Sequence, residues 1–252
     1  MKRISIVVPM YNEKDGIPLL ADTMARLAER VTQIGYELEC VLVDDGSRDG
    51  TSDEAARVFA GFPRVIQAKH ERNRGLGAAV RTGFGKATGD IICTIDSDCT
   101  FDPLQIPEML LVLERERVDI VTASPYHPKG GVENVKPWRL LLSKGASVIY
   151  RRVAAAKLFS YTALLRAYRR SVIENVDFEA DGFAATTEFL LRAVQAGYKV
   201  AEVPSILKTR LIGVSKMKVL YTIRTHVGLM FKALWWRFFD RSARPKLAAR
   251  SL

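Results

Sequence analysis

The sequence has few cysteines and lacks several features that would place the chain outside the ordinary globular proteins. Its three cysteines, Cys40, Cys93 and Cys99, show neither metal-ligand spacing nor a disulfide framework. They therefore indicate free thiols, buried at positions 40 and 93, and a reducing, cytoplasmic compartment. No segment has a disordered composition, and no solenoid repeat is visible. Residues 4–8 read as a strand rather than a signal peptide.

Acidic residues are almost absent from the C-terminal part. The stretch from Ile206 to Leu252 contains eleven of the 38 Lys and Arg residues but only one of the 28 acidic residues, Asp240. The rest of the chain is neutral, so the net charge of +10 belongs to this stretch. A basic tail is typical of an anionic membrane surface or of nucleic acid, or it is simply solvated.

The tail also has a helical apolar pattern, from Met217 to Phe239. Four basic residues interrupt the pattern, which excludes an efficient membrane-spanning helix and favours one lying in the bilayer interface. A helix docked on the protein's own core or on a membrane partner protein is the alternative; nucleic acid is not expected, because an apolar stripe does not suit a phosphate backbone. We expect residues 1–216 to form the main domain and residues 217–252 a tail at the cytoplasmic face of the membrane. The stripe comprises Leu220, Ile223, Val227, Met230, Phe231, Leu234 and Phe238.

Short apolar runs alternate with helical patterns along the first half. The runs Ile4–Pro9, Leu38–Val43, Arg64–Ala68, Ile91–Ile95 and Asp119–Ala123 are rich in Val and Ile, as strands buried on both faces are. This order predicts an α/β fold with a mainly parallel sheet and helices on both faces. Further helices are expected at Gly16–Ile34, Thr51–Ala60, Leu76–Ala87, Pro103–Glu116, Trp138–Ala156 and Thr187–Ala196, a strand at Tyr198–Val203 and a long loop at Ser124–Pro137.

Two carboxylates, Asp96 and Asp98, follow the buried run Ile91–Ile95. Residues two apart in an extended segment point the same way, and ligands of open α/β sheets bind outside the carboxyl ends of the strands. Carboxylate oxygens from two such residues suit Mg²⁺ or Mn²⁺, with a substrate diphosphate supplying further ligands. An ordinary Asp-Ser-Asp turn is the alternative.

Two other strand ends are polar. The first strand is followed by Tyr11, Asn12 and Glu13, and Pro9 is expected to end its ladder. The second ends in Asp44 and Asp45. An aromatic ring can stack on a nucleobase, and carboxylates can bond a base or ribose. The alternatives are a helix start capped by Asn12 and a turn with an N-cap.

A glycine pattern, Asn73-Arg74-Gly75-Leu76-Gly77, opens a helix. It lacks the third small residue of a dinucleotide fingerprint and does not follow the first strand, which argues against an oxidoreductase.

Together these motifs resemble, in order and spacing over about the first 125 residues, those of family 2 glycosyltransferases, which have the GT-A fold. The resemblance implies a metal-dependent, inverting hexosyltransferase that uses a nucleotide diphosphate sugar linked to GDP or UDP. It implies that Asp96 and Asp98 hold Mg²⁺ or Mn²⁺ on the donor diphosphate, with Asp98 catalytic. The positions implied for donor binding are Pro9, Tyr11, Asn12, Glu13, Asp44, Asp45, Asp96 and Ser97.

The second half contains the segments Gly130–Asn134, Trp138-Arg139, Ser143–Ala146, Leu165–Arg170, Glu202–Pro204 and Arg210–Lys216. Through these segments it resembles the polyprenol-phosphate branch, which is similar to dolichol-phosphate mannose synthase. Resemblance to that branch implies that Arg139, Ser143, Arg210 and Lys216 hold the acceptor phosphate, the three basic residues acting in catalysis. An acceptor phosphate is already anionic, so it requires cationic groups and no general base.

The chain departs from this branch at three places. Thr100 stands where the branch usually has Gln, Ser124-Pro125-Tyr126 replaces Ser-Arg-Tyr, and Ala163-Leu164-Leu165 replaces Ser-Gly-Phe. One phosphate-binding Arg is thus missing, and we expect a divergent subgroup. His127 or Lys129 is a candidate for the missing cation.

Other functions remain open at the level of sequence. Transfer to a hydroxyl of a polysaccharide or glycolipid requires a general base, for which Glu188 and Asp181 are available. A non-catalytic nucleotide-sugar or membrane-binding protein is disfavoured because the donor motifs are intact.

Overall fold

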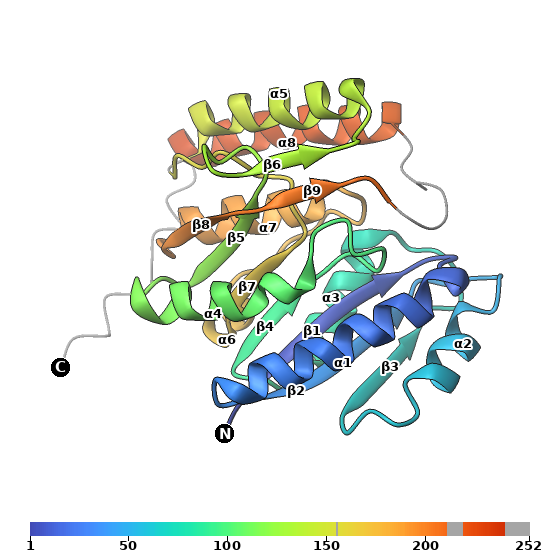
Figure 1. The fold of residues 1–252 in the computed structure, drawn as a ribbon. Helices are drawn as coiled ribbons and strands as arrows, with labels where there is room; N and C mark the ends of the chain where they lie inside the picture. Colours follow the sequence, from blue (N-terminus) through green and yellow to red (C-terminus); the bar gives the residue numbers. More distant parts are fainter. Residues whose placement is uncertain (155, 211–218, 240–252) are drawn as a thin grey trace.

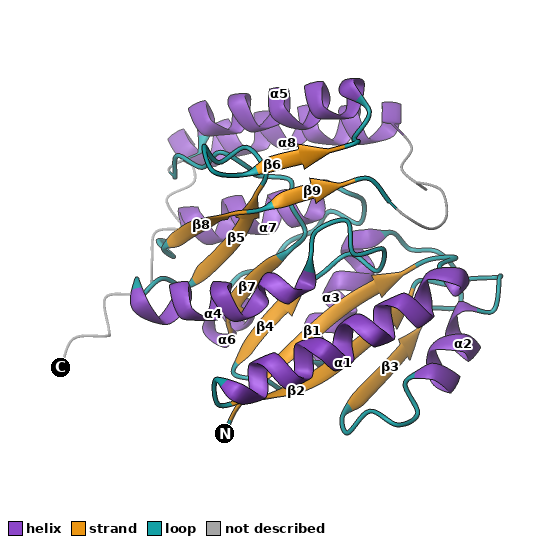
Figure 2. Cartoon of the chain, viewed as in Figure 1, coloured by secondary structure: helices purple, strands orange, loops and turns teal. Residues whose placement is uncertain are grey.

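The computed structural model describes residues 1–154, 156–210 and 219–239, with the side chains of the last helix described up to residue 236. Its centre is a seven-stranded sheet in the order β3-β2-β1-β4-β7-β5-β8, beside a two-stranded sheet of β6 and β9 (Figure 2). Strand β7 is antiparallel to both of its neighbours, whereas the other pairs are parallel. The mainly parallel α/β fold predicted from the sequence is confirmed.

The strands β1, β2, β4, β5 and β7 are mostly buried, whereas β3, β6, β8 and β9 are largely half-buried or exposed. The apolar runs around Ile4, Val41 and Ile92 form central strands whose side chains contact helices on both faces, which explains their nearly continuous Val and Ile content. The bounds are β1 Lys2–Met10, β2 Tyr36–Asp44, β3 Val65–Lys69, β4 Ile91–Thr94, β5 Ile120–Ser124, β6 Gly131–Glu133, β7 Arg166–Arg169, β8 Val200–Pro204 and β9 Ile206–Lys208.

Helices enclose the sheet on two sides, α1 and α4 on one and α3 and α7 on the other (Figure 1). One apolar core lies between the sheet and α1, α2 and α4, and the second lies between the sheet and α3, α5, α6, α7 and α8. The bounds are α1 Ile17–Gln33, α2 Thr51–Val58, α3 Leu76–Lys86, α4 Ile106–Arg115, α5 Pro137–Val153, α6 Arg170–Asn175, α7 Ala185–Gln195 and α8 Val219–Phe239, with 3-10 turns η1 Lys14–Gly16 and η2 Pro103–Gln105.

The predicted elements all exist, within a few residues of the expected bounds. The expectation that Pro9 ends its ladder is wrong, because β1 continues through Met10 and Pro9 pairs with Val43. The Val7 carbonyl accepts a hydrogen bond from the Ile95 N–H, just past the end of β4. Pro9 lies two residues further along β1 and faces the same side as Val7, where β4 has already ended. The missing N–H of proline therefore costs no ladder hydrogen bond.

The predicted loop at Ser124–Pro137 contains the short strand β6, which pairs with β9. Strands β7 and β9 and helix α6 were not predicted. Cys40 and Cys93 are buried free thiols, as expected, and Cys99 is half-buried.

Helix α8 packs on the domain mainly through a face other than the predicted stripe, of which only Met230 contacts the second core among the residues described there. Leu229, Ala233 and Trp236 are buried in the second core, and α8 lies along α5 (Figure 1). Leu220 and Phe231, which belong to the predicted stripe, are 84% and 69% exposed. The helix therefore has a docked face and a second apolar face that is largely exposed.

Among the described residues, no helix combines the length and the apolar character required to cross a bilayer.

Candidate active site

The sheet topology brings the three polar strand ends together. Strands β2, β1 and β4 are parallel neighbours, with Met10 opposite Asp44 and Val7 opposite Thr94. The residues that follow these strands therefore meet at one edge, as predicted. This edge carries the four motifs of the first 100 residues.

The first two motifs are joined by hydrogen bonds. The Asn12 backbone N–H donates to Ser47 Oγ at 2.8 Å, and Asn12 Oδ1 accepts from the Arg48 N–H at 3.0 Å. The Glu13 N–H donates to Thr51 Oγ1 at 2.9 Å. Asn12 has a φ of 53°, so it forms the corner between strand and turn rather than the helix cap that was the alternative.

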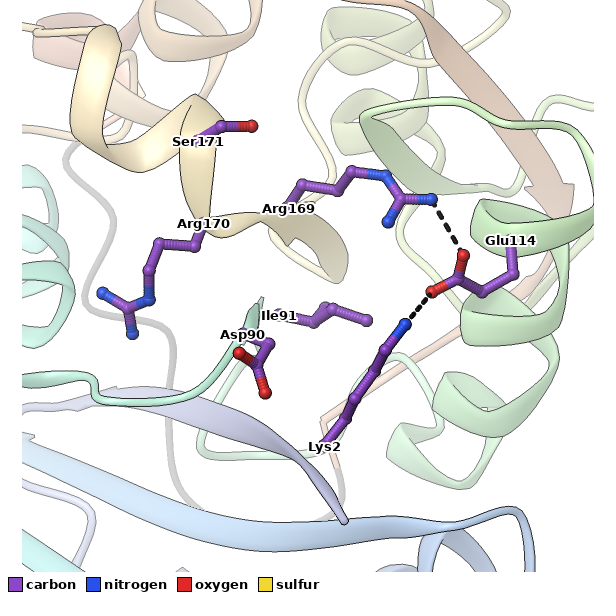
Figure 3. A pocket seen from close by; sticks show the side chains of 7 residues that line it. All are labelled: Lys2, Asp90, Ile91, Glu114, Arg169, Arg170 and Ser171. Atoms are coloured by element: carbon purple, nitrogen blue, oxygen red, sulfur yellow. Dashed lines mark hydrogen bonds and ion pairs between the residues drawn. The ribbon is translucent and has the colours of Figure 1, made fainter.

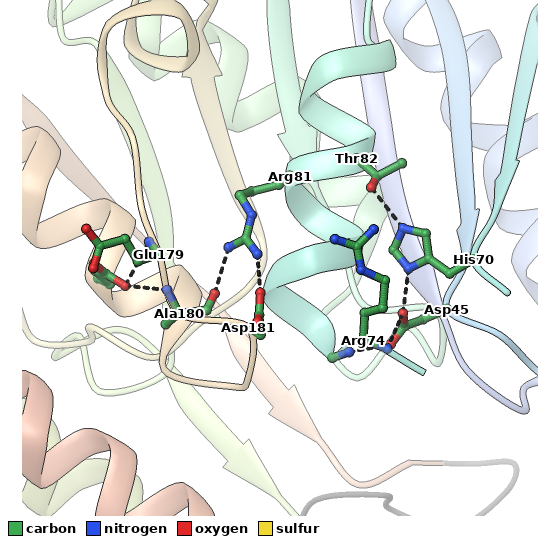
Figure 4. A network of polar contacts seen from close by, with 10 residues as sticks. Asp45, His70, Arg74, Arg81, Thr82, Glu179, Ala180 and Asp181 are labelled. Atoms are coloured by element: carbon green, nitrogen blue, oxygen red, sulfur yellow. Dashed lines mark hydrogen bonds and ion pairs between the residues drawn. The ribbon is translucent and has the colours of Figure 1, made fainter. Parts of the chain in front are cut away.

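Asp45 holds the glycine motif in place (Figure 4). Its carboxylate accepts from the Arg74 N–H at 2.9 Å and the Gly75 N–H at 2.7 Å, and Oδ1 lies 2.6 Å from His70 Nδ1. His70 Nε2 lies 2.9 Å from Thr82 Oγ1 on α3. Sequence reasoning missed His70, because a lone histidine after a strand carries no recognisable signal.

Asp44 differs from Asp45 in having an oxygen to spare. The side chain is 1% exposed, and Oδ1 accepts from the Ser47 N–H at 2.9 Å. Oδ2 is buried and has no hydrogen-bond partner among the described residues. A buried carboxylate oxygen without a partner is costly, so of this pair Asp44 is the one still able to accept a hydrogen bond from a bound base.

The remaining carboxylates form an acidic edge, defined here as Glu13, Asp96 and Asp98. Arg210, which follows β9, contacts two of them: Nε donates to Asp98 Oδ2 at 2.6 Å and Nη1 to Glu13 Oε1 at 2.9 Å. Asp98 Oδ1 accepts from the Thr100 N–H at 3.1 Å. The structure thus places Arg210 on Asp98, one of the two predicted metal-binding carboxylates, and on Glu13, a predicted donor-binding residue.

The charges at this edge perturb each other. Burial, and after it the negative charge of Asp98, raise the pKa of Asp96 well above its ordinary value, and Arg210 opposes this shift. Burial disfavours the charged form of Arg210, but Asp98 and Glu13 outweigh it and raise the pKa of the guanidinium. Burial and the neighbouring carboxylate thus disfavour the charged form of Asp96, and Arg210 favours it.

The donor set fits a divalent ion shared with a ligand. In the described part of the chain, no three His, Cys, Asp or Glu side chains form a complete metal cage. Mg²⁺ is usually held by one or two carboxylates together with substrate phosphates. The pair Asp96 and Asp98 matches that requirement.

The predicted acceptor residues on α5 are partly buried. Ser143 Oγ lies 2.8 Å from Thr162 Oγ1, and the Arg139 guanidinium lies 5.4 Å from the Trp138 ring centroid. Arg139 Nε is a buried donor without a hydrogen-bond partner among the described residues. Partnerless donors of this kind suit an anion. Lys216 lies outside the described residues.

The two candidate general bases come from α7 and the loop before it: Glu188 lies in α7, and Asp181 lies beside Arg81 of α3 (Figure 4). Glu188 is 2% exposed, and its carboxylate accepts from the Glu179 and Ala180 N–H groups at 3.3 and 2.8 Å and from Arg192 Nε at 2.9 Å. Both of its oxygens are engaged, so it holds the loop before α7. The Asp181 side chain is 59% exposed and pairs with Arg81.

A pocket at the opposite edge of the sheet is lined by Lys2, Asp90, Ile91, Glu114, Arg169, Arg170 and Ser171 (Figure 3). Its charges are largely paired: Glu114 contacts Lys2 at 3.2 Å and Arg169 at 3.1 Å. The pocket lies at the amino ends of β1 and β4 and is not part of the predicted site.

An open, mainly parallel sheet with carboxylates and a glycine-opened helix at one edge defines the GT-A class of nucleotide-sugar transferase folds. Residues 5–177 match the model of glycosyl transferase family 2. The chain belongs to this family and is a glycosyltransferase.

Two named relatives point to one branch. The chain is 32% identical to polyprenol monophosphomannose synthase of Mycolicibacterium smegmatis, over 99% of this chain and 92% of the relative. It is 30% identical to dolichol-phosphate mannosyltransferase of Pyrococcus furiosus over 93% of this chain, but spans only 64% of that protein. The predicted resemblance is confirmed.

A solved structure supports the fold. Glucosyl-3-phosphoglycerate synthase from Mycobacterium tuberculosis, in complex with Mn²⁺, UDP and glucosyl-3-phosphoglycerate, superposes with a TM-score of 0.69. The match covers 92% of this chain and 80% of the other at 19% identity. The GT-A fold is therefore confirmed.

Proposed function

We propose that this chain transfers a hexose from a nucleotide diphosphate sugar to a polyprenyl phosphate, with inversion at the anomeric carbon. The names of the two relatives, one acting on polyprenol and one on dolichol phosphate, support this acceptor class. The observation that carries the proposal is the acidic edge on one side of the sheet, held together with Arg210. It provides both signs of charge required to bring two phosphorylated substrates together.

The donor lies along the carboxyl ends of β1, β2 and β4 in this proposal. Tyr11 is half-buried and provides a ring on which the nucleobase stacks. Asp44 Oδ2 accepts a hydrogen bond from the same nucleobase. Pro9 is buried within β1, so it shapes the floor of this position. Ser97 is 8% exposed and lies between the two metal-binding carboxylates.

Asp96 and Asp98 would hold Mg²⁺ or Mn²⁺, which neutralises charge on the departing diphosphate when bound. The synthase from Mycobacterium tuberculosis has been solved with Mn²⁺ and also with Mg²⁺, each with UDP, which supports a divalent ion on this fold.

Transfer requires no proton removal. A phosphate oxygen of the acceptor attacks the anomeric carbon while the bond from that carbon to the donor diphosphate breaks, and the nucleoside diphosphate leaves with the electron pair. Arg139, Ser143, Arg210 and Lys216 are assigned to the phosphates. The buried donor Arg139 Nε supports an anion beside α5. Cationic donors reduce the repulsion between the two substrates.

The molecule would meet its lipid through a two-helix surface, defined as the exposed apolar faces of α5 and α8, which lie side by side (Figure 1). Such a patch, joined to a basic tail, fits an anionic bilayer. We therefore assign residues 1–216 to the GT-A domain and residues 217–252 to a tail that binds the cytoplasmic face of a membrane, alone or with a membrane partner protein. The exposed side chains include Trp138, Leu141, Val148 and Ile149 on α5, and Leu220, Val227, Phe231 and Trp235 on α8.

The test is a transfer assay with purified protein, Mg²⁺ or Mn²⁺, labelled GDP- and UDP-sugars and a short polyprenyl phosphate. We expect metal-dependent label in the organic phase from one donor. Asp98→Asn should lose at least about 100-fold in transfer, since metal stabilisation of the leaving group is worth several kcal/mol. Asp22→Asn, the same change at a side chain 66% exposed on α1, is the control.

Near wild-type transfer by Asp98→Asn would overturn the metal assignment. Donor binding with no transfer to any lipid phosphate would overturn the acceptor assignment.

A further inference from the structure

Arg210 occupies an unusual position among the cations of this molecule. Its guanidinium connects two loops that are 112 and 197 residues away in the chain, those carrying Asp98 and Glu13. The side chains of Arg210, Asp98 and Glu13 are 19%, 11% and 9% exposed. The cluster is therefore shielded from solvent far more than a surface ion pair is, and its rupture without replacement is costly.

Both oxygens of Asp98 already accept a hydrogen bond in this arrangement. Oδ1 accepts from the Thr100 N–H, and Oδ2 accepts from Arg210 Nε at 2.6 Å. A divalent ion on Asp98 would stand within a few Å of the guanidinium, and like charges at that distance repel strongly in a partly buried site. Arg210 and a metal ion can share the acidic edge only if further negative charge enters it.

The backbone that carries Arg210 is anchored close to the edge. Lys208 N–H donates to the Thr100 carbonyl at 2.9 Å, and Thr209 N–H donates to the Glu133 carbonyl at 3.1 Å. Strand β9 is also paired with β6 along its length. Because the backbone is held up to Thr209, Arg210 changes partners mainly by moving its own side chain. Its guanidinium therefore stays within reach of a ligand bound at Asp98.

We propose that Arg210 is an internal counter-ion that competes with the divalent metal for Asp98 and leaves it when the donor diphosphate arrives. The diphosphate oxygens take over the guanidinium, and Asp98 is released to the metal. Metal and nucleotide then bind as a coupled pair, and the metal alone binds weakly. The inference rests on the proposed function, since it assigns the metal to Asp98.

This exchange would prevent two unproductive states. Metal without donor leaves a charged ion at an open edge, and donor without metal leaves its diphosphate beside three carboxylates. Because Arg210 compensates the acidic edge until both arrive, neither half-loaded state is favoured. The two ligands would raise each other's affinity by the same factor, as linkage requires.

The test measures Mn²⁺ binding by electron paramagnetic resonance, with and without UDP or GDP, and requires no acceptor. Arg210→Gln should bind Mn²⁺ alone about tenfold more tightly than wild type, which corresponds to about 1.4 kcal/mol. The enhancement of Mn²⁺ affinity by the nucleotide should shrink in the same variant. An unchanged or weaker affinity for Mn²⁺ alone would overturn the proposal.

The control is Lys208→Gln, which removes the same charge two residues away. Lys208 is 54% exposed and pairs with Glu133 at 3.8 Å, away from the acidic edge. It should leave Mn²⁺ binding within about twofold of wild type, since exposed pairs are weak and screened. An equal gain in Lys208→Gln would mean that net charge alone sets the affinity, and would overturn the exchange.

Arg210→Lys provides a second route if the Gln variant does not fold. It keeps the charge, but an ammonium lacks the planar fork that contacts Asp98 and Glu13 together. We expect a smaller gain in Mn²⁺ affinity than for Gln, and a wild-type affinity would contradict the exchange. If the wild type binds Mn²⁺ and nucleotide as a coupled pair but transfers no sugar, only the acceptor assignment is refuted. The Mn²⁺ affinities of the variants test the role of Arg210 separately.

Discussion

The replacement of Glu188 by Gln separates the two acceptor chemistries. If the acceptor is a hydroxyl and Glu188 is its general base, the loss of the carboxylate should slow turnover by about 10²–10⁴-fold. If the acceptor is a phosphate, no base is required. The structure supports the second case, because the Glu188 oxygens are held by two backbone N–H groups and by Arg192.

The expected cost of Glu188→Gln is therefore one of stability. In the variant, the amide oxygen can still accept from the Ala180 N–H. The amide NH₂ would then take the place of Oε1, which lies 2.9 Å from Arg192 Nε in the wild type, so that two donors would face each other. Breaking a buried charged pair costs about 3–5 kcal/mol. Arg192 is 28% exposed and also contacts Glu179 at 3.5 Å, so its charge is not stranded. We expect about 2 kcal/mol of destabilisation, near the value for a hydrogen bond to a charged group.

The assay combines urea unfolding with the turnover rate per folded molecule, measured well below the thermal midpoint. Arg192→Met is the matched control, since it breaks the same ion pair from the other side and leaves the carboxylate. Both variants should lose stability and turn over within about threefold of the wild-type rate, because neither removes a group that the reaction uses. Turnover that is slower by about two orders of magnitude or more in Glu188→Gln, with stability retained and Arg192→Met active, would refute the reasoning and make Glu188 the base.

Three further predictions concern the docking of α8, the glycine motif and the two-helix surface. Burial lowers the pKa of His226, which lies 2.9 Å from the Tyr150 hydroxyl, to about 4. An exposed imidazole protonates near pH 6.5, so the undocked state binds more protons below that pH; docking stability should be full above about pH 6.5 and fall toward pH 4. Trp fluorescence and the thermal midpoint would report this, and a His226→Phe variant with the same pH profile would contradict it. Gly77→Ala should destabilise the fold by several kcal/mol in urea unfolding, because its Cβ would overlap the Ala180 carbonyl oxygen; Gly85→Ala, which meets open space on the same helix, should not. Phe231→Ser should weaken binding to anionic vesicles about tenfold in co-sedimentation, whereas Leu111→Ser, 59% exposed on α4, should not; equal losses would argue against the two-helix surface.

The first half of the fold was predictable because each central strand is buried on both faces. Such a strand is a short run of Val and Ile, and its polar end marks the carboxyl edge of the sheet. Strands in parallel order bring those ends together without any further information. The acidic edge follows from local pattern and one topological rule, which is why Asp96 and Asp98 could be placed from the sequence alone.

Strand β7 was not predictable by the same reasoning. It is four residues long, and it contains Arg166, whose side chain is buried at 0% exposure. The guanidinium donates to the carbonyls of Tyr161 and Thr186 and to the hydroxyl of Thr122. A charged residue normally indicates a surface, so a buried arginine held by carbonyl oxygens conceals a strand in the middle of the sheet.

The tail shows why an amphipathic pattern does not identify its partner. The sequence favoured the stripe containing Leu220 and Phe231, whereas the structure buries the face containing Leu229, Ala233 and Trp236. Both faces are apolar enough to be covered, so periodicity alone cannot choose between them. Tertiary packing against α5 and α7 decides which face the domain takes.

The position of Arg210 depends on the whole fold in the same way. Its two partners follow β1 and β4, and its own segment is set by the pairing of β9 with β6 and by the bond from Lys208 to Thr100. The sequence gives reason to expect a cation for the phosphates, but which anion it contacts before the substrates arrive depends on contacts 112 and 197 residues apart. Because the carboxylate proposed to bind the metal and the cation proposed to bind phosphate contact each other, neither charge is stranded before the substrates bind. In the proposed exchange, the same contact couples the donor to its metal.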